Sequence, residues 1–297
     1  MLPRRIRPRT KPTHLIDGDP DSRSLERVRG SVLGVTGATG APGRTFLAIN
    51  LALSLRVAGM SVALVDADPH LGAVAVQLDL AEDRSLVYLA HESALHTVDD
   101  ELVSRHLQTS FGLDVLTGRT VAGLDELVPG SLLSDVVRLL RLHYDAVVLD
   151  VGALDCLAAQ STALMCQMLV WVVVPTKLGT DLLDRTLSGP FTSPVRPRPS
   201  LAVVNRLGNA ALREVDSSLR RRYGMAVAAA IPDNSRACTD AENQARPAAL
   251  GGPLSRPLLR CAHVVGLALA RLAEDPAHAV GEVRSQFDAQ LHSEGAL

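Results

Sequence analysis

The sequence has 297 residues, of which 47% are hydrophobic, 21% charged and 3% aromatic, and its formal net charge is -2. This composition excludes a wholly disordered chain and a globally basic nucleic-acid binder, and the length suffices for one large domain or two small ones. Because aromatic residues are scarce, we expect a core packed mainly from Leu, Val and Ala.

The first 30 residues differ in composition from the rest of the chain. They contain eight Arg or Lys residues, four acidic residues and prolines at positions 3, 8 and 12, with almost no apolar periodicity. We therefore predict that residues 1–30 form a basic, disordered N-terminal arm. Two interpretations of the arm are open: a solvated extension without a partner, or an electrostatic contact with DNA, an anionic membrane or an acidic protein.

From residue 31 onward, short apolar runs alternate with segments of helical periodicity. Several runs are continuously apolar, which is typical of parallel strands covered on both faces. The sequence thus predicts an α/β fold, with a doubly wound, mainly parallel sheet and helices on both faces, over residues 31–275. The predicted strands are 31–36, 61–65, 113–116, 146–149, 169–174, 201–204 and 226–230. The predicted helices are 45–58, 131–143, 154–165, 211–223 and 257–273.

Residues 276–297 are predicted to form a separate amphipathic helix at the C-terminal end. Val280, Val283, Phe287 and Leu291 recur at steps of three and four residues and so form one apolar stripe. The polar face mixes acidic and basic residues instead of being rich in Lys and Arg. We therefore expect this helix to dock on the domain or on a partner protein in preference to lipid.

Cysteine usage and apolar content predict a soluble protein of a reducing compartment. The four cysteines, Cys156, Cys166, Cys238 and Cys261, form no CxxC pair, which argues against a zinc site and a disulfide framework. No secretion signal is visible, and the most apolar stretch, 168–175, is too short to span a bilayer. We expect a cytoplasmic location, with peripheral association at a membrane or the nucleoid left open.

The most informative stretch is a glycine-rich turn between a predicted strand and a predicted helix, GATGAPGRT over residues 37–45. Glycines let backbone N–H groups approach phosphate oxygens, and the start of the helix adds its dipole and unpaired donors. As in a P-loop, Arg44 can reach the β- and γ-phosphates and the Thr45 hydroxyl can bind Mg²⁺. The turn departs from the P-loop consensus at Ala38 and Arg44, and its glycine spacing does not match a dinucleotide-binding GxGxxG motif.

Carboxylates follow two further predicted strands. Asp66 and Asp68 follow one of them, and Asp150 ends another. The carboxyl ends of parallel strands meet at the sheet edge where open α/β folds bind ligands, and a strand-ending Asp is the usual Walker B residue. His70 is close to these carboxylates in the chain, and it is either a metal or phosphate contact or an ordinary surface residue of the loop.

With this loop, the Val-Asp-Ala-Asp-Pro motif at 65–69 and a later strand ending in Asn205, residues 31–273 resemble the ParA/MinD family of deviant Walker A ATPases. The nearest likeness is to CpaE-like and septum-site-determining proteins. The resemblance implies ATP and Mg²⁺ as cofactors, with Asp68 positioning the attacking water and Asn205 recognising adenine. The implied catalytic residues are Asp68 and Arg44, and the implied metal ligands are Thr45, Asp66 and Asp150. The implied nucleotide-binding residues are Gly40, Ala41, Gly43, Arg44, Thr45, Phe46, Asn205 and Pro232.

The function implied by this resemblance is that of an ATPase that dimerises with ATP and Mg²⁺ and positions cell-division, segregation, or pilus and secretion machinery. An unidentified protein partner would trigger slow hydrolysis. Active members carry a loop lysine that reaches the nucleotide of the dimer partner, and Thr39 stands there in this sequence. Arg44 keeps the charge of the second loop lysine with a different shape. The alternatives to a weak ATPase are a non-hydrolysing scaffold or localisation factor and a Rossmann-type NAD(P) oxidoreductase.

Overall fold

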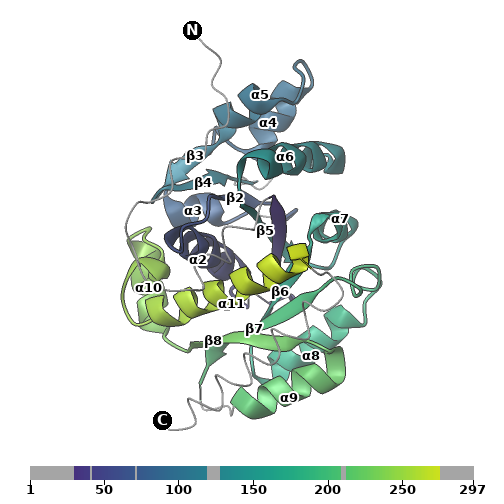
Figure 1. Cartoon of the computed structure of the whole chain (residues 1–297), viewed down its shortest axis with the longest axis vertical. Helices are drawn as coiled ribbons and strands as arrows, with labels where there is room; N and C mark the ends of the chain where they lie inside the picture. Colours follow the sequence, from purple (N-terminus) through teal and green to yellow (C-terminus); the bar gives the residue numbers. More distant parts are fainter. Residues whose placement is uncertain (1–29, 41, 71, 119–127, 209–211, 275–297) are drawn as a thin grey trace.

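The computed structural model describes residues 30–40, 42–70, 72–118, 128–208 and 212–274, and these contain an eight-stranded sheet. The strand order is β3-β4-β2-β5-β1-β6-β7-β8, running from the top to the bottom of Figure 1. All neighbouring strands are parallel except β3 and β4. The strands are β1 (Ser31–Gly37), β2 (Val62–Asp66), β3 (Gln108–Ser110), β4 (Leu113–Leu116), β5 (Ala146–Ala153), β6 (Met168–Val173), β7 (Ser200–Leu207) and β8 (Ala226–Pro232).

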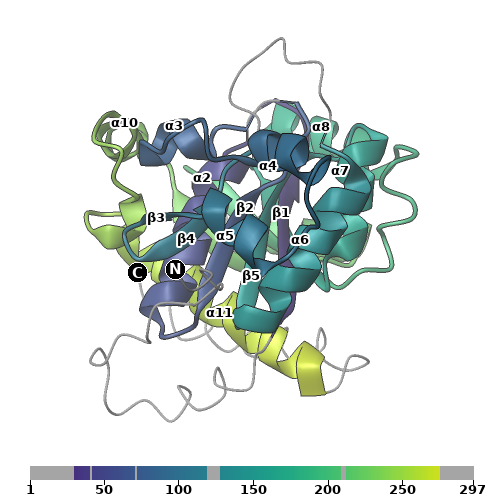
Figure 2. The ribbon, with the colours of Figure 1, turned by 90° about the horizontal axis from the view of Figure 1, so that it is seen from above.

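Helices cover both faces of the sheet, as predicted. In Figure 2, α2, α3 and α10 lie to the left of β1 and β2, and α6 and α7 lie to their right. The helices are α2 (Arg44–Val57), α3 (Val74–Leu78), α4 (Leu86–Ser93), α5 (Asp100–His106), α6 (Gly130–His143), α7 (Leu157–Met165), α8 (Lys177–Leu187), α9 (Leu212–Tyr223), α10 (Ser235–Asn243) and α11 (Ser255–Glu274). The doubly wound α/β fold expected from the sequence is therefore confirmed.

The core consists of two apolar layers, one on each face of the sheet. Strand β5 contributes to both, since Val148 packs in the layer of α2 and α11 while Val147 and Leu149 pack in the layer of α6 and α7. The buried side chains are mostly Leu, Val and Ala, with Trp171 and Tyr144 as aromatic members. Because successive strand residues point to opposite faces, a continuous apolar run is what a doubly covered strand requires.

Two predicted strand ends are wrong in a way that affects the site. β5 continues past Asp150 to Ala153, because Thr36 and Gly37 of β1 pair with its last residues after a bulge. Asp150 therefore lies inside a strand, not at its end. β7 likewise continues past Asn205, to Leu207. The other predicted strands and helices are present among the described residues, with ends shifted by a few positions.

Several elements were not predicted, namely β3, α3, α4, α5, α8 and α10. Most are short, and α10 buries none of its side chains, so they offer few apolar positions from which to predict them. The basic arm, except for Gly30, and the C-terminal helix predicted over 276–297 lie outside the described residues. None of the described helices is both long enough and apolar enough to cross a membrane.

The strand order gathers the candidate residues at one edge of the sheet. β1 lies between β5 and β6. The connections that leave the carboxyl ends of β1 and of a neighbouring strand therefore run in opposite directions at this point of the sheet. Such a topological switch point is where open α/β sheets bind their ligands. The glycine-rich turn follows β1, and the segments after β2 and β5 flank it on one side.

Candidate functional site

The glycine-rich turn joins β1 to α2 through two residues in the left-handed region. Gly40 has a φ of 88° and Gly43, which directly precedes α2, has a φ of 94°. A side chain is strained in this conformation, so both positions favour glycine. Gly43, the N-cap residue of α2, has no side chain that could occupy the N–H groups of the first turn. The N–H groups of the first turn are therefore available to an anion, whose charge the helix dipole favours.

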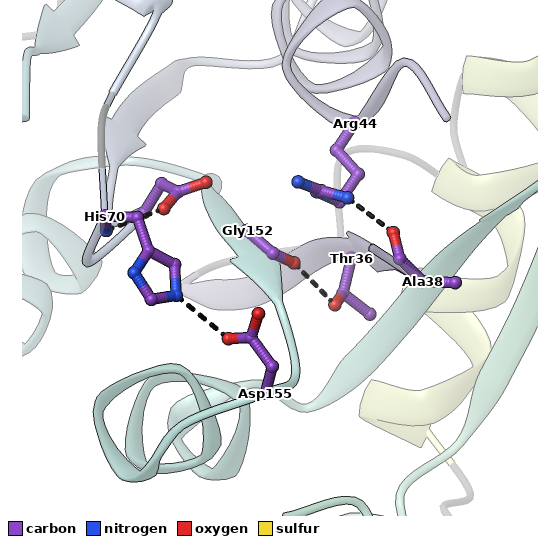
Figure 3. A network of polar contacts seen from close by, with 7 residues as sticks. Thr36, Ala38, Arg44, His70, Gly152 and Asp155 are labelled. Atoms are coloured by element: carbon purple, nitrogen blue, oxygen red, sulfur yellow. Dashed lines mark hydrogen bonds and ion pairs between the residues drawn. The ribbon is translucent and has the colours of Figure 1, made fainter. Parts of the chain in front are cut away.

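Arg44 folds back over this turn. Its Nη1 donates a hydrogen bond to the Ala38 carbonyl oxygen at 2.6 Å, and Figure 3 shows the side chain reaching from the start of α2 toward Ala38. Thr39 and Gly40 are exposed at the tip of the turn, and Ala41 lies outside the described residues. The guanidinium thus places a permanent positive charge beside the N-terminus of α2, as the binding of phosphate would require.

Asn205 contacts the turn from the neighbouring part of the sheet. Its Nδ2 donates to the Pro42 carbonyl oxygen at 2.8 Å, and only 8% of the residue is exposed. A Cβ on Gly43 would lie 2.4 Å from the same Nδ2, so the glycine also makes room for this contact. The adenine-recognition role implied by the resemblance stays a prediction, whereas the observed contact fixes the position of the turn.

Phe46 and Pro232, the two remaining residues predicted to bind the nucleotide, differ from each other in burial. Phe46 is half-buried and packs against the apolar layer of α2 and α11. Pro232 is exposed at the end of β8, opposite Leu207 of β7. Because the Phe46 side chain packs into the core, Phe46 can face a ligand at the turn with its backbone but not with its side chain. Pro232 lies at the same edge of the sheet as Asn205.

Asp66 and Asp150 form a buried pair of carboxyl groups. They are register partners on β2 and β5, and both residues have an exposed fraction of 0%. Asp66 Oδ2 accepts a hydrogen bond from the Val74 N–H at 3.1 Å. Within the part of the chain that the structure describes, neither carboxylate oxygen of Asp150 makes a hydrogen bond of good geometry, although the Thr45 hydroxyl and the Gly152 backbone lie close enough to affect its pKa. A buried polar group normally has a hydrogen-bond partner, so the Asp150 carboxylate retains the capacity to bind a further ligand.

Burial shifts the acidity of this pair upward. It raises the pKa of Asp66 well above its ordinary value, and the nearby charge of Asp150 adds to the effect. Burial also raises the pKa of Asp150 to about 6, although the Thr45 hydroxyl and the Arg44 charge oppose the shift. Two carboxylates beside a threonine hydroxyl are the hard oxygen donors that Mg²⁺ prefers, and they fit the ion implied by the resemblance.

Asp68 lies at the outer end of this edge and is half-exposed. Its Oδ1 accepts the His70 backbone N–H at 2.9 Å. Its carboxylate lies against Gly152, where a Cβ would be 2.5 Å from Oδ2. Gly152 in turn accepts a hydrogen bond from the Thr36 hydroxyl at 2.8 Å, a contact drawn in Figure 3. Asp68 is thereby held beside the junction of β1 and β5, next to the glycine-rich turn.

Three residues that shape the site were not predicted: Thr36, Gly118 and Gly152. A Cβ on Gly118 would lie 2.7 Å from the Asp66 carbonyl oxygen, and Gly152 has a φ of 75°. Gly152 carried a usable signal, since a glycine two positions after a strand aspartate indicates a close approach of another chain segment. The sequence around Thr36 and Gly118 carried no such signal, because their contacts with Gly152 and Asp66 join segments far apart in the chain.

A mainly parallel sheet with a glycine-rich strand-to-helix turn at its switch point, and aspartates on the neighbouring strands, is an arrangement with which α/β folds bind phosphate-bearing ligands. Comparison with solved structures places the fold more narrowly, since it matches that of MinD and ParA ATPases. No protein-family model and no curated protein matches the sequence.

Three solved structures illustrate this likeness. The MinC:MinD cell division protein complex of Aquifex aeolicus is 19% identical, with a TM-score of 0.65, over 79% of this chain and 95% of that one. Septum site-determining MinD with Mg-ADP from Pyrococcus horikoshii is 18% identical, with a TM-score of 0.65, over 78% and 94%. A ParA family ATPase from Chlorobium tepidum is 18% identical, with a TM-score of 0.64, over 80% and 98%. At this level of identity the likeness establishes the fold.

Proposed function

We propose that this chain is a ParA/MinD-like ATP-binding protein, nearest to the CpaE-like type, whose dimerisation is switched by nucleotide. The observation that carries the proposal is the buried Asp150 carboxylate, which makes no hydrogen bond of good geometry among the described residues. It lies near Thr45, in the first turn of a helix whose N-cap residue, Gly43, has no side chain. The N-terminus of this helix suits the phosphates of a Mg²⁺–nucleotide complex, and the carboxylate beside it suits the Mg²⁺ ion.

Each side chain then has a role that follows from its position. ATP with Mg²⁺, when bound, supplies the phosphoryl group and part of the charge that its transfer requires. Thr45, Asp66 and Asp150 hold the ion, while Arg44 and the backbone from Gly40 to Gly43 hold the phosphates. Asp68, half-exposed at the outer end of the edge, orients the attacking water.

The base side of the nucleotide lies toward β7 and β8 in this proposal. Asn205 and Pro232 are at that edge, and Asn205 fixes the Pro42 carbonyl of the turn. Phe46 contributes its backbone at the start of α2. We propose the domain organisation expected from the sequence, with residues 31–275 as the nucleotide-binding domain, residues 1–30 as a basic arm and residues 276–297 as a docking helix.

Turnover is expected to be weak. Thr39 is exposed at the tip of the turn and carries no charge with which to reach a dimer partner's nucleotide. Of the two lysines in the sequence, Lys11 belongs to the arm and Lys177 begins α8, after β6. Loss of a cation that stabilises the transition state reduces the rate of phosphoryl transfer by orders of magnitude. A non-hydrolysing scaffold is therefore the second candidate function, and Thr39 is the observation that favours it.

The biological role proposed is the positioning of division, segregation, or pilus and secretion machinery. One solved relative is a cell division protein in complex with MinC and another carries Mg-ADP, which supports a nucleotide and a protein partner for this chain. We propose a homodimer, an activating partner protein and a cytoplasmic location. Peripheral contact with the nucleoid or an anionic membrane would come from the basic arm.

Nucleotide titration of the full chain tests the proposal. We expect ATP with Mg²⁺, but not NAD(P), to raise the melting temperature and to bind with a stoichiometry of about one, as one P-loop per chain requires. Arg44→Ala should abolish the shift, whereas Arg138→Ala, which removes an exposed ion pair with Asp135 on α6, should leave it unchanged. No shift for the wild type would overturn the proposal. Binding without turnover, even with an activating partner, would favour the scaffold.

A further inference from the structure

A second cluster of ligating side chains lies beside Asp68, on the exposed rim of the same edge. It consists of His70, from the segment between β2 and α3, together with Asp155 and Cys156, which directly precede α7. One ligand atom from each residue lies within 4.8 Å of the others. His70 and Asp155 are 85 positions apart in the sequence, so only the fold brings them together.

The backbone around each of the three residues is held in place. The His70 N–H donates to Asp68, and its Nε2 lies 2.9 Å from Asp155 Oδ1, a contact drawn in Figure 3. The Asp155 N–H donates to the Ala153 carbonyl at 2.9 Å. The Cys156 carbonyl accepts the Gln160 N–H at 3.1 Å and so begins α7. The cluster thus joins two segments that have ordered hydrogen bonds of their own.

The donor set identifies the kind of ion. Imidazole nitrogen, carboxylate oxygen and thiolate sulfur together suit a zinc-type transition metal, whereas Mg²⁺ prefers oxygen alone. Around a tetrahedral zinc with bonds of about 2.0–2.3 Å, ligand atoms lie about 3.3–3.8 Å apart. The observed limit of 4.8 Å therefore requires only small side-chain rotations, in which the direct His70–Asp155 contact opens to admit the ion.

The geometry points to a zinc-type metal site formed by the His70 imidazole, the Asp155 carboxylate and the Cys156 thiolate. The side chains of His70 and Asp155 are 59% and 39% exposed, so a fourth position is open to water. On binding, the metal–sulfur bond replaces the S–H bond and the thiol proton passes to solvent, while the imidazole binds in its neutral form. The site differs in residues and in preferred ion from the Asp66–Asp150 pair.

Occupancy of the site would link α7 to the segment that carries Asp68. The His70 N–H holds the Asp68 carboxylate, so restraining His70 also restrains Asp68. If the proposed ATPase function holds, the metal tunes the orientation of the attacking water. The binding itself does not depend on that function.

Titration of the metal-free full chain with Co²⁺, a spectroscopic substitute for Zn²⁺, tests the inference. We expect about one ion per chain, in line with a single three-ligand site, and an absorption band from thiolate-to-cobalt charge transfer. Cys156→Ser should remove the band. His70→Ala should weaken Co²⁺ binding by at least about tenfold. Mutating a residue that merely hydrogen-bonds to a metal ligand already costs about that much affinity, and His70 is a direct ligand in this proposal.

The matched control is Cys238→Ser, since Cys238 is also a half-buried cysteine but lies on α10. This variant should keep both the band and the affinity, and Zn²⁺ should displace the cobalt. The inference is overturned if no thiolate band forms, if the band survives Cys156→Ser, or if Cys238→Ser removes it. Because all three ligands are at least partly exposed, circular dichroism should show each variant folded. ATP binding, measured separately, reports on the proposed function alone.

Discussion

Asp66 and Asp150 face each other in register across β2 and β5, both fully buried, and the N–H of Ala67 donates to the Asp150 carbonyl at 3.0 Å. The backbone of the parallel pair thus fixes two carboxyl groups side by side. Without a cation, burial and mutual repulsion disfavour their ionised forms. The same arrangement favours a divalent ion, which neutralises both charges.

The first prediction concerns the pH dependence of stability. The pKa of Asp150 rises from 3.8 to about 6 in the folded state. Between these values the folded state binds more protons than the unfolded state, so without Mg²⁺ the free energy of unfolding falls as pH increases and stays lower above pH 6. Asp150→Asn should remove the contribution of Asp150 to this slope, leaving that of Asp66, and raise the free energy of unfolding at neutral pH by up to about 3 kcal/mol.

Urea denaturation as a function of pH measures the effect. Asp150→Asn should also lose any stabilisation by ATP with Mg²⁺, whereas Asp135→Asn, on the exposed side of α6, should change neither property. If Asp150→Asn were less stable than the wild type at neutral pH without Mg²⁺, the description of Asp150 as a buried carboxylate without a compensating partner would be wrong.

The second prediction concerns the glycine that accommodates Asp66. A Cβ on Gly72 would lie 2.2 Å from Asp66 Oδ2, closer than atoms can approach without displacement. Gly72→Ala should therefore lower the free energy of unfolding by about 1–3 kcal/mol, as overpacked interiors do, and weaken binding of ATP with Mg²⁺. Gly130→Ala is the control, since no atom lies within 4 Å of its added Cβ. Equal urea midpoints for the two variants would refute the steric argument.

The third prediction concerns the contact between Asn205 and the glycine-rich turn. Asn205→Ala removes the hydrogen bond to the Pro42 carbonyl, and we expect a loss of about 1 kcal/mol in the free energy of unfolding, together with weaker ATP binding. Asn205→Asp should weaken ATP binding further, because it cannot donate and adds a negative charge near the phosphates. Calorimetric titration measures both variants. Asn243→Ala, at the exposed end of α10, should match the wild type, and equal affinities for the Asn205 and Asn243 variants would disprove the role.

The fourth prediction restores the charge that Thr39 lacks. Because Thr39 is exposed, Thr39→Lys should change the free energy of unfolding by no more than about 0.5 kcal/mol. If the chain dimerises as its resemblance to the ParA/MinD family implies, the new lysine should increase ATP-dependent dimerisation and turnover. Light scattering and phosphate release measure these effects. Thr97→Lys, in the exposed connection between α4 and α5, serves as the control. An unchanged rate and unchanged mass would argue that position 39 does not face a partner's nucleotide.

Local patterns in the sequence determined the fold class and the sheet edge at which the candidate residues gather. Continuous apolar runs predicted parallel strands, and the glycines at 40 and 43 predicted a tight turn because their backbone conformation disfavours side chains. The aspartates that follow apolar runs predicted a common sheet edge. These inferences succeeded because each depends on residues that are close together in the chain.

Only the tertiary structure decided which side chains meet. Asn205 holds a turn 163 positions away, and β5 extends past Asp150 because β1 pairs with it, so neither fact has a local signal. The spacing of the cysteines argued against a zinc site, yet the fold places Cys156 beside His70 and Asp155. Metal-ligand spacing in a sequence detects only ligands that share one segment. The candidate ligands here come from two strand-to-helix connections, and the pairing of β2 with β5 places those connections next to each other.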